Sequence, residues 1–493
     1  MKPHIIFLCL ALSIVSCKKD NGDNQTPITK GSRLELSLDS IYLYAKETYL
    51  WYDRLPDYNT FNPRQYASSG NEMLSLQSDL KAVTDLAVNP GTGRSYEFRE
   101  GHPLPLYSYI AEGNIITGQQ ASVDLAGNGN DLGLGLSIVD DSQVYVRTVE
   151  RDSPAGSSGI ARGMKLVRVN DDPVQVNATA LNNLLNSPIL TLQFERQDAT
   201  VFTVTLHAKK YSASPILASA TLSTGDQKIG YIVLSRFSIL ETCQLALKQI
   251  FEDFSQQGIK SLIIDLRYNS GGYVQTAEYL ANLMAPAKIE GKPMYSEKFN
   301  ALLQQRKAPI LKTIPYLDNN GQPVYIDGRK ATYADIDFSE KGNTHYFSGS
   351  GTLTGIEKIV FIVSGATASA SELLINTMKP YVQVRLVGTT TYGKPVGFFG
   401  IGIDKYTLYL SQFSIRNARN EGDYYEGLQP DINAWDDVTR DFGDQKENCL
   451  ATAIADIGQN APAPNTNRSN KKVQATSDLT FPTMIEKRLK LLH

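Results

Sequence analysis

The sequence predicts a multidomain α/β protein, and three observations carry this prediction. The chain has 493 residues, a length for which about three domains are expected. Strand-like and helix-like runs alternate from Ile229 to about Thr439, as in an α/β core. Residues 117–211 instead hold a series of short strand-like runs, which indicates a separate β-rich domain. With 42% hydrophobic and 20% charged residues, the chain can form sizeable cores.

The predicted core begins with a strand at Gly230–Phe237 and a helix-like stretch at 239–254. A second apolar strand, SLIIDL, follows at Ser261–Leu266, and another helix is expected after Tyr273. Residues 294–351 are polar and contain Gly and Asn. We therefore expect this stretch to be an insertion that forms a flexible flap.

The β-rich region contains the strand-like runs DLGLGLSI (Asp131–Ile138) and VYVRTV (Val144–Val149). Its middle part, Ser153–Asp171, reads SPAGSSGIARGMKLVRVND. Before this region, apolar residues recur at helical spacing within 34–55, which predicts a small helical N-terminal domain.

These patterns divide the chain into six predicted segments. They are a signal peptide at 1–16, a tether at 17–30, a helical domain at 31–116, a β-rich domain at 117–211, a core at 212–440 and a tail at 441–493. The tail contains the polar run APAPNTNRSNKK, which indicates disorder, and a stretch at 484–492 that we expect to form a helix.

Ser369 lies at a predicted strand-to-helix junction. The run KIVFIVSG (Lys358–Gly365) is apolar and β-branched, small residues follow it, and apolar residues recur at helical spacing from Ala370 to Tyr381. Free backbone N–H groups at a helix start favour negative charge, so an oxyanion formed by attack of this serine would be stabilised there. The alternative is that Ser369 only caps the helix.

Lys394 is the candidate base for this serine, because a serine hydroxyl needs an adjacent base to become a nucleophile. A lysine can act as a base only when it is neutral, and burial lowers its pKa by several units. The apolar runs on both sides, 385–391 and 396–403, suit such a site. The alternative is a solvated lysine in a turn.

Gly388–Lys394 also matches most of the phosphate-binding pattern G-x-x-x-x-G-K. The next residue should be Ser or Thr and should begin a helix. It is Pro395, and a strand-like run follows, so we do not expect a phosphate site.

A third motif, DLRYNSGG (Asp265–Gly272), completes a resemblance to the C-terminal processing (tail-specific) peptidases of family S41. The GLQPDI run (Gly427–Ile432) resembles the closing element of that family. The resemblance implies a crotonase-like (ClpP-type) α/β protease core and hydrolysis of peptide bonds without a cofactor or a metal. It implies Ser369 as nucleophile and Lys394 as base, a Ser-Lys dyad.

The same resemblance implies an oxyanion hole formed by the amide of Ala370 and by a glycine of the DLRYNSGG loop. That glycine is either Gly271 or Gly272, with Gly271 preferred. Asp265 is expected to pair with Arg267 to hold the loop. Many members of the family carry a glutamine four residues after the lysine, and this chain has Phe398 there.

The β-rich region resembles a PDZ domain, because SPAxxxGI followed by RGMKLVRVND is found in bacterial proteases. The resemblance implies that the backbone of Leu132, Gly133, Leu134 and Gly135 receives the carboxylate of a bound peptide, which adds to the sheet as a strand. The alternative is a β-domain that only spaces or gates the active site.

The N-terminal sequence indicates that the protein is exported. Lys2, the apolar run Ile5–Val15 and the residues before Cys17 form a signal peptide that resembles a bacterial lipoprotein signal, with Cys17 lipidated. The sequence predicts an envelope protein anchored by lipid, in the outer membrane and facing either side. Cys243 and Cys449 remain for one possible disulfide, although Cys243 is also compatible with a small buried apolar group.

Composition excludes several function classes. The formal net charge of −3 gives no argument for nucleic acid binding. With five histidines, of which His345 alone precedes the Ser369 strand closely, a Ser-His-Asp triad is the weaker mechanism. The alternatives to a peptidase are a lipoprotein that binds peptides or hydrophobic ligands on a protease fold, and a PDZ-based scaffold. The oligomeric state stays open.

Overall fold

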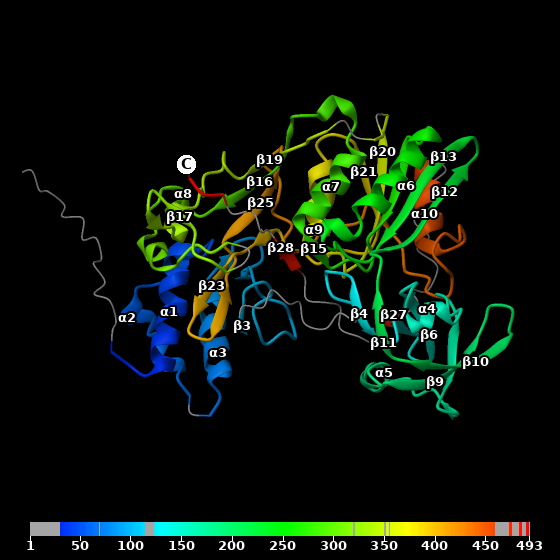
Figure 1. Cartoon of the computed structure of the whole chain (residues 1–493), viewed down its shortest axis with the longest axis horizontal. Coiled ribbons are helices and arrows are strands. Elements are labelled where there is room, and N and C mark those ends of the chain that lie inside the picture. Colours follow the sequence, from blue (N-terminus) through cyan, green and yellow to red (C-terminus); the bar gives the residue numbers. More distant parts are fainter. Residues whose placement is uncertain are drawn as a thin grey trace, which may run out of the picture.

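The structure is a computed structural model, and Figure 1 shows the whole chain. It describes residues 30–68, 70–113, 123–318, 321–349, 352–353, 355–458, 473–475, 483–485 and 490–492. The predicted signal peptide and Cys17 lie outside the described residues. Among the described residues, no helix is both long and apolar enough to cross a membrane.

A six-stranded sheet forms the centre of the molecule. Its strands, in spatial order, are β12 (Ile216–Thr224), β13 (Gln227–Leu234), β14 (Ser261–Asp265), β20 (Lys358–Val363), β21 (Gln383–Gly388) and β26 (Ile432–Asn433). The β12–β13 pair is antiparallel, and the other pairs are parallel. The strands β14 and β20 are buried on both faces, as their continuous apolar runs predict.

Helices cover both faces of this sheet. On one face lie α6 (Gln244–Gln256), α7 (Val274–Met284) and α9 (Ala370–Met378), and on the other lies α10 (Asn448–Ile457). Alternate residues of β20 enter the two cores: Ile359 and Phe361 face the first three helices, and Val360 faces α10. The predicted alternation of strands and helices is therefore confirmed.

Residues 294–351 are not a flap. The strand β16 (Pro293–Phe299) pairs with β25 (Phe413–Asn417) and β19 (Thr344–Tyr346), and β25 also pairs with β22 (Val396–Gly397). Buried apolar residues of this stretch, such as Phe299, belong to the main core. The prediction was wrong because the polar composition of the stretch conceals its regularly spaced apolar residues.

The N-terminal region shares this main core. Its helices α1 (Arg33–Thr48) and α3 (Glu72–Asp85) pack their apolar faces onto it. The strand β3 (Tyr109–Glu112) pairs with β24 (Tyr406–Tyr409), which pairs with β23 (Gly400–Ile403). The region that we predicted as a helical domain therefore packs as part of one body with the α/β core (Figure 1).

A second body has its own core and forms the β-rich domain, residues 123–212 (Figure 1). Its main sheet contains β10 (Val201–His207), β9 (Ile189–Glu195), β7 (Lys165–Val169), β6 (Gln143–Val149) and β5 (Leu134–Val139), with β8 (Asp172–Pro173) beside β7. Two short helices, α4 (Pro154–Ser157) and α5 (Ala178–Leu185), complete it. The strands β4 (Asn128–Asp131) and β11 (Lys209–Ser212) form a separate antiparallel pair.

The predicted C-terminal tail differs from the structure in two ways. The boundary at 440 is too early, because α10 packs on the central sheet and belongs to the core. The helix expected at 484–492 is also wrong, because Thr483–Ile485 form a strand, β28. Another strand, β27 (Val473–Ala475), pairs with β5, and β28 pairs with β15 (Gly271–Tyr273).

Both cysteines within the described part of the chain are free. Cys243 and Cys449 are buried in different cores, on opposite faces of the central sheet, so the possible disulfide does not form. Cys243 is a small apolar group of the main core, as the sequence indicated.

Candidate active site

Ser369 lies in the turn between β20 and α9, directly before the first residue of the helix. Its backbone has φ 61° and ψ −114°, a combination that is unfavourable for a residue with a side chain. Such strain persists only when the surrounding structure imposes it, and it is concentrated at functional sites. The side chain is completely buried, and its Oγ forms no hydrogen bond with any described residue. Ser369 and Glu372 have the arrangement of a capping box, but the strained backbone and the buried, unsatisfied hydroxyl favour a role for Ser369 beyond capping.

The serine turn is tied to the loop that follows β14. Thr367 Oγ1 donates to the carbonyl of Leu266 at 2.8 Å, and the N–H of Ala368 donates to the carbonyl of Asn269 at 3.1 Å. Ser371 Oγ also donates to the Asn269 carbonyl, at 3.0 Å. These bonds bring the DLRYNSGG loop beside Ser369, although about a hundred residues separate the two in sequence.

The two glycines of this loop adopt backbone angles that favour glycine. Gly271 has φ 106° and Gly272 has φ 133°, and a Cβ on Gly272 would lie 2.1 Å from the carbonyl oxygen of Phe237. The N–H of Gly271 donates to Asn269 Oδ1 at 3.0 Å. The amide that we preferred as an oxyanion donor is therefore already engaged. The oxyanion roles of Gly271, Gly272 and Ala370 stay predictions.

A buried ion network fixes the start of the loop. Arg267 binds Asp265 with two nitrogens, as expected, with Nη2 at 2.7 Å. It also donates to Asp436 at 2.8 Å and to Glu447 at 3.0 Å. Removing one member of such a buried group costs about 3–5 kcal/mol, because the other charges lose their partner. The sequence indicated the first pair but neither Asp436 nor Glu447, since both lie more than 160 residues further along the chain.

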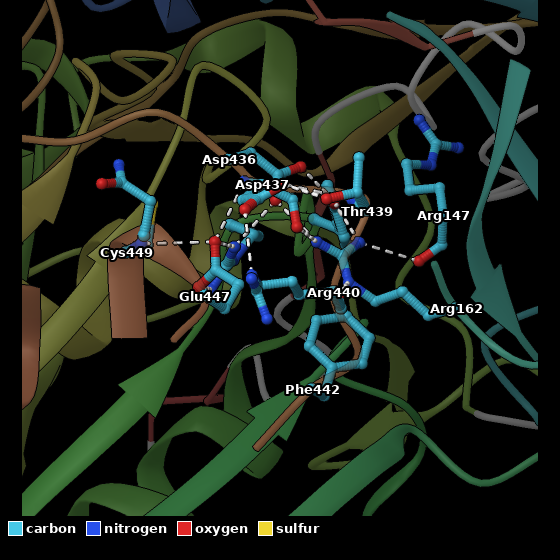
Figure 2. A network of polar contacts seen from close by, with 12 residues as sticks. Arg147, Arg162, Asp436, Asp437, Thr439, Arg440, Phe442, Glu447 and Cys449 are labelled. Carbon is cyan, nitrogen blue, oxygen red and sulfur yellow. Dashed lines mark hydrogen bonds and ion pairs between the residues drawn. The ribbon is translucent and has the colours of Figure 1, made fainter. Parts of the chain in front are cut away.

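The network also joins the β-rich domain to the core. Arg162 donates to Asp436 at 2.7 Å and to the hydroxyl of Tyr268 at 2.8 Å. Figure 2 shows Arg162 and Glu447 on different sides of Asp436 and Asp437, with Arg162 bound to Asp436 and Glu447 accepting the N–H of Asp437. Since Tyr268 follows Arg267 in the glycine loop, the β-rich domain contacts the loop that lies beside Ser369.

Lys394 lies in the turn between β21 and β22. Gly393 precedes it with φ 90°, and a Cβ there would lie 2.5 Å from the carbonyl oxygen of Tyr425. No helix follows Lys394, as expected from Pro395, so the described structure contains no phosphate-binding loop at this place.

The carboxylate of Glu372 joins the lysine turn to the serine turn. Its Oε2 accepts the N–H of Ser369 at 2.9 Å and the N–H of Lys394 at 2.8 Å. The two amide nitrogens therefore lie no more than about 6 Å apart. Its Oε1 accepts the N–H of Gly393 at 2.7 Å and the hydroxyl of Thr391 at 2.5 Å. No local sequence signal connects Glu372 with Lys394, and the contact forms because Lys394 folds next to the start of α9.

The Lys394 side chain is completely buried. Burial lowers the pKa of Lys394 to about 7, although the negative charges of Glu97 and Glu372 act in the opposite direction. Its Nζ lies 4.7 Å from the centre of the Phe398 ring. Phe398 thus occupies the position of the family glutamine and presents an aromatic face to the amine. The lowered pKa favours the neutral amine that the sequence-based hypothesis requires.

The N-terminal region holds the lysine turn from the other side. Arg99 donates to the carbonyl of Tyr392 at 3.0 Å and lies over its ring, and the Tyr107 hydroxyl donates to the carbonyl of Gly393. Glu97 is buried and accepts the hydroxyl of Ser108 at 2.7 Å. No sequence signal connected this region to Lys394.

The alternative triad lacks support in the described residues, where no histidine donates to or accepts from Ser369. His345 lies on β19, where its Nδ1 is 2.8 Å from Glu278 and its ring stacks on Tyr295. The residues predicted to bind a peptide lie in the β-rich domain where β5 begins, and β5 belongs to a different sheet from β20, the strand before Ser369. These residues are Leu132, Gly133, Leu134 and Gly135.

Comparison with known proteins identifies the central part of the chain. Residues 228–434 match the family model described as Peptidase family S41. The match contains Ser369, Lys394, Glu372 and the glycine loop. It does not include Glu97 or Glu447, which contact the same site from outside these limits.

Curated relatives agree with this match. The chain is 26% identical over 290 residues to a chloroplastic C-terminal processing peptidase of Tetradesmus obliquus, covering 54% of this chain and 52% of that protein. It is 27% identical over 190 residues to a carboxyl-terminal-processing protease of Synechocystis, covering 38% of this chain and 34% of that protein. The chain thus spans between about a third and a half of the length of these relatives.

One solved structure supports the fold. A protein of Bacteroides fragilis described as an S41 protease superposes with a TM-score of 0.58 and 19% sequence identity. The match covers 85% of this chain and 97% of that structure. At this identity the comparison shows a shared fold and nothing about substrates.

Replacing Glu372 with Gln should loosen both turns. The glutamine side chain has one acceptor oxygen instead of two, and its NH₂ group would face N–H donors. Some of these buried donors would therefore have no acceptor, and each unsatisfied donor destabilises the folded state by about 1–3 kcal/mol. We expect a free energy of unfolding lower by roughly 2–4 kcal/mol in urea. The exposed Glu357→Gln, which loses only a surface contact with Lys260, should change it by less than about 1 kcal/mol. Equal losses in both variants would contradict the role of Glu372.

Replacing Lys394 with Met should stabilise the protein at neutral pH. The folded-state pKa of about 7 lies below the unfolded value of 10.5, so the unfolded chain binds an extra proton between these values. Wild-type stability therefore rises with pH across this window. We expect Lys394→Met to gain up to about 4 kcal/mol at pH 7, with the gain shrinking towards pH 10.5. A gain independent of pH in denaturant titrations would contradict the buried amine.

Proposed function

We propose that this chain, whose residues 228–434 form a peptidase family S41 domain, is a serine endopeptidase with a Ser-Lys dyad. One observation carries the proposal most directly. The buried Lys394, whose pKa is lowered to about 7, and the strained Ser369 have their backbone amides on the same Glu372 oxygen. A nucleophile and an amine that is neutral at physiological pH are the two groups that such a reaction requires.

In the proposed reaction, Ser369 Oγ attacks the carbonyl carbon of a peptide bond, and Lys394 Nζ accepts the hydroxyl proton. The tetrahedral oxyanion accepts hydrogen bonds from the amide of Ala370 and from Gly271 or Gly272 of the loop. As the C–N bond breaks, Lys394 returns the proton to the leaving amine. Water then hydrolyses the acyl-enzyme, with Lys394 again accepting and returning a proton, and the free serine is restored.

We further propose that the β-rich domain is a PDZ domain that captures extended segments of protein substrates. The edge of β5 that pairs with β27 supports this role, because a peptide strand can add there through main-chain hydrogen bonds. Contact of Arg162 with Asp436 and Tyr268 would keep a captured segment on the side of the glycine loop.

The location is a separate proposal. Lipidation at Cys17 would anchor the enzyme to the cell envelope, where unfolded envelope proteins are its substrates. Cys17→Ala should move the protein from the detergent-extracted membrane fraction to the soluble fraction and abolish labelling by a palmitate analogue. Equal labelling of the two proteins would contradict the anchor.

Casein cleavage by the signal-free protein tests the chemistry. Ser369→Ala should reduce kcat/KM by at least about a thousandfold, because the nucleophile is lost. Lys394→Arg should reduce it comparably, since a guanidinium cannot deprotonate in this range. Lys379→Arg, a lysine at the C-terminal end of α9 without a role in the dyad, is the matched control and should retain activity. Full activity in both dyad variants would refute the mechanism.

The pH dependence gives an independent check. The base must be neutral, so kcat/KM should rise with pH and reach half its maximum near pH 7. A fluorophosphonate probe should label Ser369 along the same curve. Absence of labelling at every pH, with peptide binding retained, would favour the alternative of a non-catalytic binding protein, which the aromatic Phe398 beside Lys394 makes chemically reasonable.

A further inference from the structure

We propose that the C-terminal segment of this chain, through Val473–Ala475, Thr483–Ile485 and residues 490–492, occupies the enzyme's own peptide-binding track. The proposal rests on the proposed function, because it names an occupant for the same site. In this proposal the segment competes with substrates from within the same chain. It is attached at three places along the route that a substrate would follow.

The first attachment lies on the β-rich domain. The strand β27 adds antiparallel to β5, with Val473 opposite Val139 and Ala475 opposite Ser137. On its other side β5 pairs with β6, so β27 fills the one edge of β5 that remains open. This is the edge to which a captured peptide would add as a strand.

The second attachment lies at the predicted oxyanion loop. The strand β28 runs parallel to β15, with Thr483 opposite Gly271 and Met484 opposite Gly272. These glycines follow Asn269, whose carbonyl accepts hydrogen bonds from the serine turn. A substrate backbone must pass beside this loop for its carbonyl to reach Ser369 Oγ, so β28 occupies a place that substrate needs.

The third attachment holds the end of the chain. The N–H of Asp337 donates to the carbonyl of Lys490, and the N–H of Leu492 donates to the carbonyl of Asp335, both at 2.8 Å. Lys490 Nζ donates to the carbonyl of Gly342 at 2.7 Å. Leu491 packs against the main core. The segment is therefore fixed beyond the glycine loop as well as before it.

These attachments lie in order across the molecule. Figure 1 shows β27 within the β-rich domain, β28 beside β15 at the centre, and the chain end on the side of β16 and α8 (Ala301–Gln304). The strand pairings use main-chain groups, which every polypeptide possesses. A covalently attached segment has an effective concentration in the millimolar range, so a weak intrinsic affinity is enough for it to compete with a free substrate.

Proline substitutions in β28 of the full chain test the proposal. Proline lacks an N–H and cannot donate to a ladder. Along a strand, the N–H groups of alternate residues point towards the same neighbouring strand. Either the N–H of Met484 or those of Thr483 and Ile485 therefore point towards β15. Met484→Pro removes the first donor, and the double variant Thr483→Pro with Ile485→Pro removes the other two. At least one variant should lower KM for casein by about threefold or more with kcat unchanged, as expected when an intramolecular competitor is lost. Thr466→Pro, outside both strands, is the control and should match wild type.

Hydrogen exchange supplies a readout that does not need activity. The amide of Gly272 should exchange faster in the β28 variants than in wild type, and Thr466→Pro should show no change. The amides of Gly271 and Tyr273 donate to Asn269 and Phe237 and serve as internal references. A synthetic peptide of residues 473–492 should restore the wild-type KM when it is added to Met484→Pro.

The outcomes separate this inference from the proposed function. Casein cleavage with unchanged KM and unchanged exchange in both β28 variants would overturn the inference while leaving the peptidase intact. Faster exchange without any casein cleavage would support the inference and count against the peptidase. A KM that rises with enzyme concentration would show that the segment binds to a second copy of the protein. That result would overturn the proposal that the segment binds within its own chain.

Discussion

The geometry of the site depends on one buried carboxylate. Glu372 accepts the amide protons of Ser369, Gly393 and Lys394 and the hydroxyl of Thr391, so a single side chain sets the distance between two turns. Burial raises the pKa of Glu372, and its four donors oppose that shift. A charged acceptor in a dry site makes strong, directional bonds, which explains how the strained serine backbone is held.

Around this carboxylate, the protein places groups from distant parts of the chain. The N-terminal region supplies Glu97 and Tyr107 to the lysine turn, and α10 begins beside Glu447, which binds Arg267 below the glycine loop. Both contributions lie outside the residues that match the family model. The part of the chain that matches the S41 family model is thus completed by its flanking segments, which share its cores.

Strand edges offer a second, less specific kind of recognition. The edge of β5 and the glycine strand β15 each pair, through main-chain groups, with a short strand of the same chain. Main-chain pairing tolerates many side chains, so such edges can bind segments of different sequence. The same tolerance allows the protein's own C-terminal segment to bind there, and its tethering compensates for short pairing lengths.

Local sequence alone determined the strand, turn and helix around Ser369, the pairing of Asp265 with Arg267 and the alternating core. These features depend on residues close together in the chain, where periodicity and small residues are informative. Only the tertiary structure decided that residues 294–351 join a sheet, that Glu372 reaches Lys394 and that residues 483–485 form a strand. The partners in these cases lie tens to hundreds of residues apart, and a strand edge or a carboxylate carries no local signal for the partner it will meet.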